Sequence, residues 1–132
     1  MKTFTIAPGI FALHADIHTT DLFEGLWPLP HGVTLNSYFV KGKKTCLIDL
    51  LKDWSGSLSQ YEQELSSLGT SFETLDYVIL NHLEPDHTAF LTELLKRNKK
   101  VQIIATEKGI ALVQKFFGLS GNFRTVKTGD TL

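Results

Sequence analysis

The chain has 132 residues, enough for one domain with a hydrophobic core. Its 13 basic and 14 acidic residues leave a net charge of −1, which predicts neither nucleic acid nor an anionic membrane as a partner. A single cysteine excludes an internal disulfide, and no stretch resembles a signal peptide or the roughly 20 apolar residues of a membrane span, so we expect a cytoplasmic protein.

The first half of the chain is typical of strands joined by turns. The turn pair Pro8-Gly9 separates two segments with alternating apolar residues, which predicts a β-hairpin. Residues 18–32 contain Trp27, Pro28, Pro30 and Gly32, a composition that predicts an irregular loop. Asp49 closes the second predicted hairpin among apolar neighbours. The predicted elements are strands at residues 4–6, 10–17, 33–40 and 45–50, and a helix at residues 58–68.

The second half alternates short apolar strands with amphipathic helices. The predicted elements are strands at residues 77–80, 101–105 and 123–127, and helices at residues 89–97 and 108–117. This alternation predicts a partly parallel sheet. Residues 127–132 are typical of a turn that introduces another strand. We therefore expect one α/β (α+β) domain over residues 1–132, a mixed sheet with flanking helices.

One short segment after the predicted strand at residues 77–80 concentrates polar groups that bind metals. Its sequence is His82-Leu83-Glu84-Pro85-Asp86-His87. In an extended chain the side chains at i, i+2 and i+4 project to one side, so we expect His82, Glu84 and Asp86 to converge. Imidazole with carboxylate suits iron, manganese or zinc. A bound cation would offset the lost hydration of such groups.

A purely structural interpretation of the same segment is also open. Asp86 would cap a helix that begins near Thr88, Glu84 would be solvated, and both histidines would be ordinary residues. Asp49 would then only make a turn at a strand end.

The segment resembles the metal motif of the metallo-β-lactamase superfamily, His-x-His-x-Asp-His at the end of a strand. Glu84 in place of the second histidine is similar to the flavodiiron proteins. Further segments resemble that family in the same order along the chain, namely residues 34–38, 46–49, 77–82 and 126–132.

This resemblance implies an αββα sandwich with a non-haem diiron centre that reduces O2 or NO. By position, His82 and Glu84 would bind one iron, and Asp86 and His87 the other. Asp49 would hydrogen-bond the ligand loop and orient it. The FMN of the family belongs to a flavodoxin domain that these residues do not match.

The family's remaining ligands, two histidines and a bridging carboxylate, follow the phrase that matches residues 126–132. We expect His14, His18 and His31 to be ordinary residues and not replacements for them. The chain is therefore expected to be the N-terminal portion of a metallo-β-lactamase-like diiron domain. It would expose an apolar sheet face and associate with its C-terminal half or form a homo-oligomer.

Three other functions remain open at this point. The chain could be a diiron sensor module that binds O2 or iron without a flavodoxin domain and reports to a signalling partner, instead of receiving electrons from an electron-transfer partner. It could be a zinc-dependent hydrolase of the same superfamily, although Glu84 disfavours this. It could also be a structural remnant that binds no metal.

Overall fold

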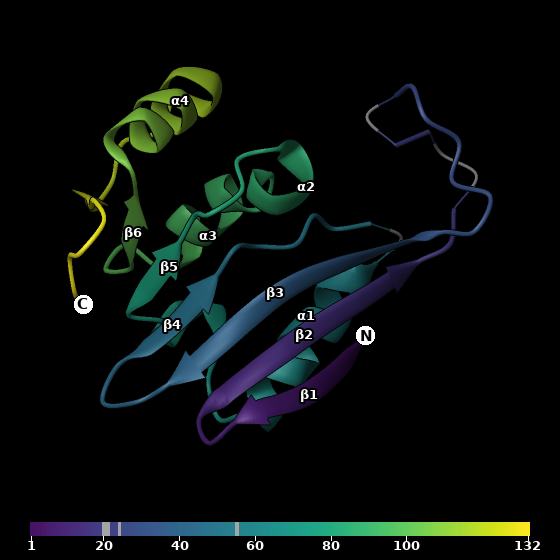
Figure 1. The fold of residues 1–132 in the computed structure, drawn as a ribbon, viewed down its shortest axis with the longest axis horizontal. Coiled ribbons are helices and arrows are strands. Elements are labelled where there is room, and N and C mark those ends of the chain that lie inside the picture. The colour runs from purple at the N-terminus through teal and green to yellow at the C-terminus, as the bar shows by residue number, and fades with distance from the viewer. Residues whose placement is uncertain (20–21, 24, 55) are drawn as a thin grey trace.

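Seven strands form one sheet in which neighbours in space are also neighbours along the chain (Figure 1). The computed structural model describes residues 1–19, 22–23, 25–54 and 56–132. The elements are β1 (Lys2–Ala7), β2 (Ile10–Ile17), β3 (Val33–Lys41), β4 (Thr45–Ile48), α1 (Ser57–Ser67), η1 (Phe72–Thr74), β5 (Tyr77–Ile79), α2 (Pro85–Thr88), α3 (Leu91–Arg97), β6 (Gln102–Ala105), α4 (Glu107–Phe117) and β7 (Phe123–Thr125). No helix of this described part is long and apolar enough to cross a bilayer.

The sheet is mixed, as the sequence predicts. Strands β1 to β4 pair antiparallel, and β5, β6 and β7 continue the sheet in parallel. Gly9 turns β1 into β2 at φ +76°, and a Cβ there would lie 2.6 Å from the Lys41 carbonyl oxygen, so glycine is required. The predicted parallel half is confirmed because each of its strands follows a helical segment that returns the chain.

One face of the sheet carries the hydrophobic core. Leu13, Phe39, Leu47, Val78 and Ile103 lie on this face of five strands, and each is fully buried. Helices α1 and α3 lie behind the sheet in Figure 1 and cover this face. Their inward residues follow the helical spacing that the sequence shows, so the amphipathic pattern accounts for the layer.

The opposite face is apolar, and none of the helices in the described part of the chain covers it. It carries Tyr38, Ile48, Tyr77 and Ile79, which are half-buried or exposed. A groove of about 370 Å³ runs over these strands and includes the buried Cys46. The expected apolar face without a covering layer is therefore present among the described residues.

Several boundaries differ from the predicted ones. Strand β4 ends at Ile48 because Asp49 adopts a left-handed conformation at φ +60°. Pro85 begins the helix α2, which the sequence analysis missed. The loop over residues 18–32 is confirmed apart from one isolated bridge between Phe23 and Trp27. The prediction at positions 20, 21 and 24 lies outside the described residues.

The C-terminal residues form the predicted turn. The N–H of Lys127 donates to Asp130 Oδ2 at 3.0 Å, and the N–H of Asp130 donates to the Lys127 carbonyl at 3.1 Å. No strand follows this turn within the described residues.

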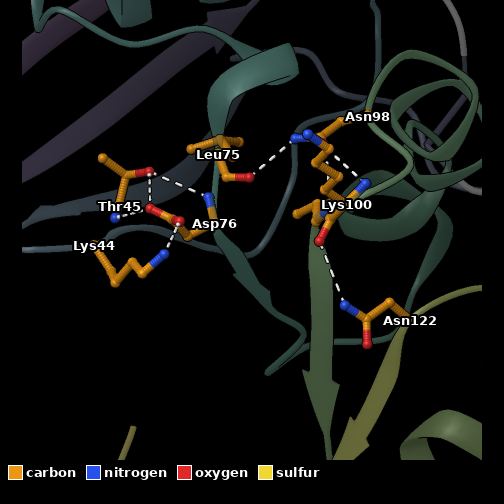
Figure 2. A network of polar contacts seen from close by, with 8 residues as sticks. Lys44, Thr45, Leu75, Asp76, Asn98, Lys100 and Asn122 are labelled. Atoms are coloured by element: carbon orange, nitrogen blue, oxygen red, sulfur yellow. Dashed lines mark hydrogen bonds and ion pairs between the residues drawn. The ribbon is translucent and has the colours of Figure 1, made fainter.

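A polar network ties together the starts of the parallel strands (Figure 2). Asp76 precedes β5 and accepts from Lys44 Nζ at 2.7 Å and from the Thr45 N–H at 2.8 Å. Asn98, buried at the end of α3, donates to the carbonyls of Phe72 and Leu75, both at 2.9 Å. Its own carbonyl oxygen accepts two further backbone N–H groups, those of residues 100 and 101. The network fixes where β5 and β6 begin.

We expect the Asp76 contacts to make stability depend on pH. The hydrogen bonds from Lys44 and Thr45 hold the pKa of the Asp76 carboxyl below its ordinary value. A lowered pKa in the folded state gives stability that is present above the unfolded value of about 3.9 and is lost as the pH falls. Asp76→Asn should therefore lower the free energy of unfolding by about 1 kcal/mol at pH 7, with the difference shrinking below pH about 4.

Urea denaturation at several pH values measures this. Lys44→Met removes the partner instead of the carboxylate and should reduce the same pH dependence. A gap between wild type and D76N that stays constant from neutral to acid pH would contradict the assignment.

Candidate metal centre

The ligand segment lies where the parallel strands end, at the edge of the sheet opposite the polar network. Strand β5 ends at Ile79, and the chain leaves the sheet through residues 80–84 before α2 begins at Pro85. Glu84 is the extended residue before this helix, at φ −68° and ψ 156°. Proline suits the first helical position because its φ is already helical and it has no N–H to satisfy. The carboxyl ends of parallel strands are a common location for binding sites.

Three of the predicted ligands come together. His82, Glu84 and Asp86 each offer one ligand atom, and these atoms all lie within 4.8 Å of one another. His82 Nε2 lies 3.0 Å from Glu84 Oε2, with both side chains exposed, whereas Asp86 is buried. The predicted convergence is present, but its reason was wrong in part. Asp86 reaches the others from the first turn of α2 and not from extended chain.

His87 lies beside this group and not in it. Its Nε2 is 3.5 Å from Asp86 Oδ2, and its ring makes an edge-to-face contact with that of His82 at a centroid distance of 5.1 Å. The prediction that Asp86 caps a helix beginning near Thr88 is wrong, because the helix already contains both residues. His87 therefore contacts both Asp86 and His82 from outside the group of three.

Two buried atoms at this site have no hydrogen-bond partner. They are Asp86 Oδ1 and His87 Nδ1, and Asn36 Oδ1 is the third such atom in the described part of the chain. A buried polar group without a partner costs about 1–3 kcal/mol. An imidazole nitrogen and a carboxylate oxygen are ligands that iron, manganese and zinc accept. The residues present thus fit a metal site.

The electrostatics of the exposed pair also favour a cation. The hydrogen bond with the Glu84 carboxylate raises the pKa of the His82 imidazole, and burial opposes this with a smaller effect. Asp86 and Asp49 add weaker negative charge. The negative charge that holds a proton on His82 is equally suited to holding a metal in its place, since a metal ligand must be deprotonated.

A frame of backbone hydrogen bonds holds the ligand segment. Asp49 Oδ1 accepts from the N–H of Asn81 at 2.7 Å and of His82 at 3.0 Å. In the next residues the N–H of Leu50 donates to the His87 carbonyl at 3.2 Å and that of Lys52 to the Asp86 carbonyl at 2.8 Å. The strand-end turn at Asp49 therefore contacts the ligand segment at both ends.

Sequence reasoning missed part of this frame. Thr88 is fully buried and its hydroxyl donates to the Glu84 carbonyl at 2.9 Å, which closes the first turn of α2. The only feature of the sequence that could have indicated this role is the position of the threonine directly after the motif. The backbone groups of Leu50 and Lys52 left no signal, because any residue offers the same N–H.

An apolar groove of about 510 Å³ adjoins the exposed pair. Its wall on the α4 side is formed by Leu112, Val113, Phe116 and Phe117, and Leu83 lies on the loop side with His82 and Glu84. Phe116 is 79% exposed, which is unusual for a phenylalanine. The ligands thus border an apolar surface on one side.

The chain is similar in sequence to proteins of a known family. The profile of the Metallo-beta-lactamase superfamily matches residues 32–126. An anaerobic nitric oxide reductase flavorubredoxin of Pectobacterium atrosepticum is 37% identical over 102 residues, covering 76% of this chain and 19% of that protein.

Solved structures agree with the sequence match. A mutant of the flavo di-iron protein from Thermotoga maritima superposes with a TM-score of 0.81 at 30% identity, covering 98% of this chain and 33% of that one. Rubredoxin oxygen:oxidoreductase from Desulfovibrio gigas gives 0.80 at 25% identity, covering 98% and 32%. The chain therefore spans at most about a third of the length of these relatives.

Proposed function

The chain belongs to the metallo-beta-lactamase superfamily, and from this membership we propose that it binds a non-haem diiron centre of the flavodiiron type. The observation that supports this most is the group of His82, Glu84 and Asp86, whose ligand atoms lie within 4.8 Å of one another. The orphaned polar atoms of Asp86 and His87 beneath it are the second support. Glutamate in place of a second histidine favours iron over zinc, because it adds a hard anionic oxygen.

The proposed roles follow the placement of the side chains. His82 and Glu84, which lie 3.0 Å apart at the surface, would hold one iron, and Asp86 and His87 would hold the other. Asp49 touches no metal in this proposal and orients the loop through its hydrogen bonds. When bound, the two irons would supply coordination positions and up to two electrons for reduction of O2 or NO, and any further electrons would come from the electron-transfer partner. The apolar groove beside Leu83 borders one side of these ligands.

We further propose that residues 1–132 are the N-terminal portion of the diiron domain. The support is that this chain covers only 19% and 33% of two relatives, whereas 76% and 98% of this chain match them. The apolar sheet face with Tyr38, Ile48 and Ile79 would receive the second layer, and the remaining ligands would come with it. FMN and an electron-transfer partner would belong to polypeptide beyond this portion or to a second subunit.

Anaerobic loading with Fe(II) tests the proposal. The protein is expected to retain iron in preference to zinc and manganese in metal analysis after desalting. Its absorption spectrum is expected to change when O2 or NO is added. Preferential retention of zinc, with no optical change on adding either gas, would overturn the diiron assignment and point to a hydrolase-type zinc site.

A further inference from the structure

The side chain of Asp49 lies far from the ligand segment in sequence and hydrogen-bonds the backbone where that segment begins. Asp49 is the single non-glycine residue with positive φ in the described part of the chain, at 60°. Such a conformation costs about 1 kcal/mol or more for a residue with a Cβ, and it persists only where the surroundings hold it. The contacts that hold Asp49 therefore bear directly on the metal centre.

Each polar group of Asp49 has a partner. Its N–H donates to the Ile79 carbonyl at 2.8 Å, and its carboxylate accepts the two N–H groups of the ligand loop. Its carbonyl oxygen accepts from Ser37 Oγ at 2.8 Å. Ser37 is fully buried on β3, so this hydroxyl is one of the groups that fix the left-handed turn.

Ser37 is in turn held by Tyr61 of α1. The two hydroxyl oxygens lie 2.7 Å apart, and Tyr61 is only 1% exposed. Each hydroxyl has a single hydrogen to donate. The Ser37 hydrogen is directed to the carbonyls of Asp49 and Ile48, so the Tyr61 hydrogen is left for Ser37 Oγ. The hydrogen bonds then run in series from Tyr61 to Ser37 to Asp49.

Burial keeps this series intact over the working pH range. Desolvation raises the pKa of the Tyr61 phenol far above its ordinary value, so the hydroxyl stays protonated and remains a donor. The aromatic ring is separately fixed by an edge-to-face contact with Phe72 at a centroid distance of 5.1 Å. Removing the hydroxyl alone therefore leaves the ring in place.

We propose that Ser37 and Tyr61 are positioning residues for the metal centre: they hold the carbonyl of Asp49, and through its left-handed turn they set the position of the ligand segment. This inference rests on the proposed metal-binding function and adds to it two residues from other elements. Neither hydroxyl contacts a ligand side chain. Their effect passes through the Asp49 carboxylate to the backbone of Asn81 and His82.

Tyr61→Phe tests the inference, with Tyr38→Phe as the matched control. Tyr38 lies next to Ser37 on β3 but on the opposite face of the sheet, is 38% exposed, and its hydroxyl makes no hydrogen bond to the described residues. The metal-free proteins are titrated with Co(II), whose visible absorption reports coordination geometry. Amide hydrogen exchange of Asn81 and His82 is measured without metal.

For Tyr61→Phe we expect about 10-fold weaker Co(II) binding, an altered absorption spectrum and faster exchange of both amides. Tyr38→Phe should match the wild type in all three. Ser37→Ala should weaken Co(II) binding at least as much as Tyr61→Phe does. The double variant should bind Co(II) no more weakly than Ser37→Ala alone, because the two hydroxyls act in series.

Two results would separate this inference from the proposed function. If the wild type binds Co(II) and Tyr61→Phe is indistinguishable from Tyr38→Phe in affinity, spectrum and exchange, the positioning role is wrong. If the wild type binds neither Co(II) nor Fe(II), the diiron proposal fails, and the positioning role for a metal centre fails with it. If, in addition, Asn81 and His82 exchange at the same rates in wild type and Tyr61→Phe, control of the loop by Tyr61 is excluded as well.

Discussion

Asp86→Ala will weaken binding of Co(II) or Fe(II) by more than about 100-fold. Loss of a residue that only supports a ligand already costs 10 to 100-fold, and Asp86 is assigned as a ligand itself. Asp86 is 6% exposed, and one of its carboxylate oxygens has no hydrogen-bond partner. Isothermal titration with either metal under anaerobic conditions measures the change.

The same variant should behave differently without metal. Alanine removes a buried oxygen that no hydrogen bond satisfies, so the metal-free protein should be as stable as the wild type or more stable. Metal should then raise the melting temperature of the wild type and leave that of D86A unchanged. Asp16→Ala, at an exposed aspartate on β2, is the matched control and should bind metal normally. Unchanged affinity in D86A, or a large loss of metal-free stability, would show that Asp86 is a structural residue.

Asn98→Ala will lower the free energy of unfolding by about 3 kcal/mol, a large fraction of the total stability of a domain of this size. Asn98 is 4% exposed and makes four hydrogen bonds, two as donor to carbonyls and two as acceptor from N–H groups. Alanine leaves these four backbone groups without that partner. The buried ones among them carry most of the cost.

Asn122→Ala is the matched control, because it removes the same side chain from the same network (Figure 2). Asn122 is exposed and its amide reaches the Lys100 carbonyl at only 3.4 Å. We expect a change within about 0.5 kcal/mol for this variant. Urea denaturation monitored by circular dichroism measures both. Equal effects of the two substitutions would contradict the role given to Asn98.

The periodic parts of the fold could be predicted from the sequence, and the short aperiodic parts could not. Alternating apolar residues around Pro8-Gly9 predict the hairpin of β1 and β2. The apolar spacing of α4 and Gly118 at its end predict that helix. Helix α2 has four residues, too few to show a period. The convergence of His82, Glu84 and Asp86 is predicted from an extended chain, and the fixed φ of Pro85 suits that conformation as well as the first position of a helix.

The end of β4 shows a different limit. Asp49 is followed by Leu50 and Leu51, so the apolar run continues past the strand. The left-handed turn is set by contacts from other segments, namely the Ile79 carbonyl and the Ser37 hydroxyl. Tertiary contacts of this kind leave no local pattern, and therefore the predicted strand was too long.

Some residues of the candidate site could likewise be predicted from the sequence, and others could not. His82 and Glu84 are close in sequence, so their proximity in space could be inferred, and Asp86 joined them for a reason other than the one given. The series from Tyr61 to Ser37 joins residues 24 positions apart. Neither residue type nor spacing singled out that pair, because a serine in a strand and a tyrosine in a helix are ordinary.

The strand order has a consequence for how this chain folds as it is synthesised. Every strand pairs with the one made just before it, so no part of the sheet has to wait for a distant segment. Such local pairing shortens the search for native contacts. Ser37 and Asp49 leave the ribosome before His82, and the turn that orients the ligands can be in place when they emerge. Construction of the metal loop can thus proceed on a frame that already exists.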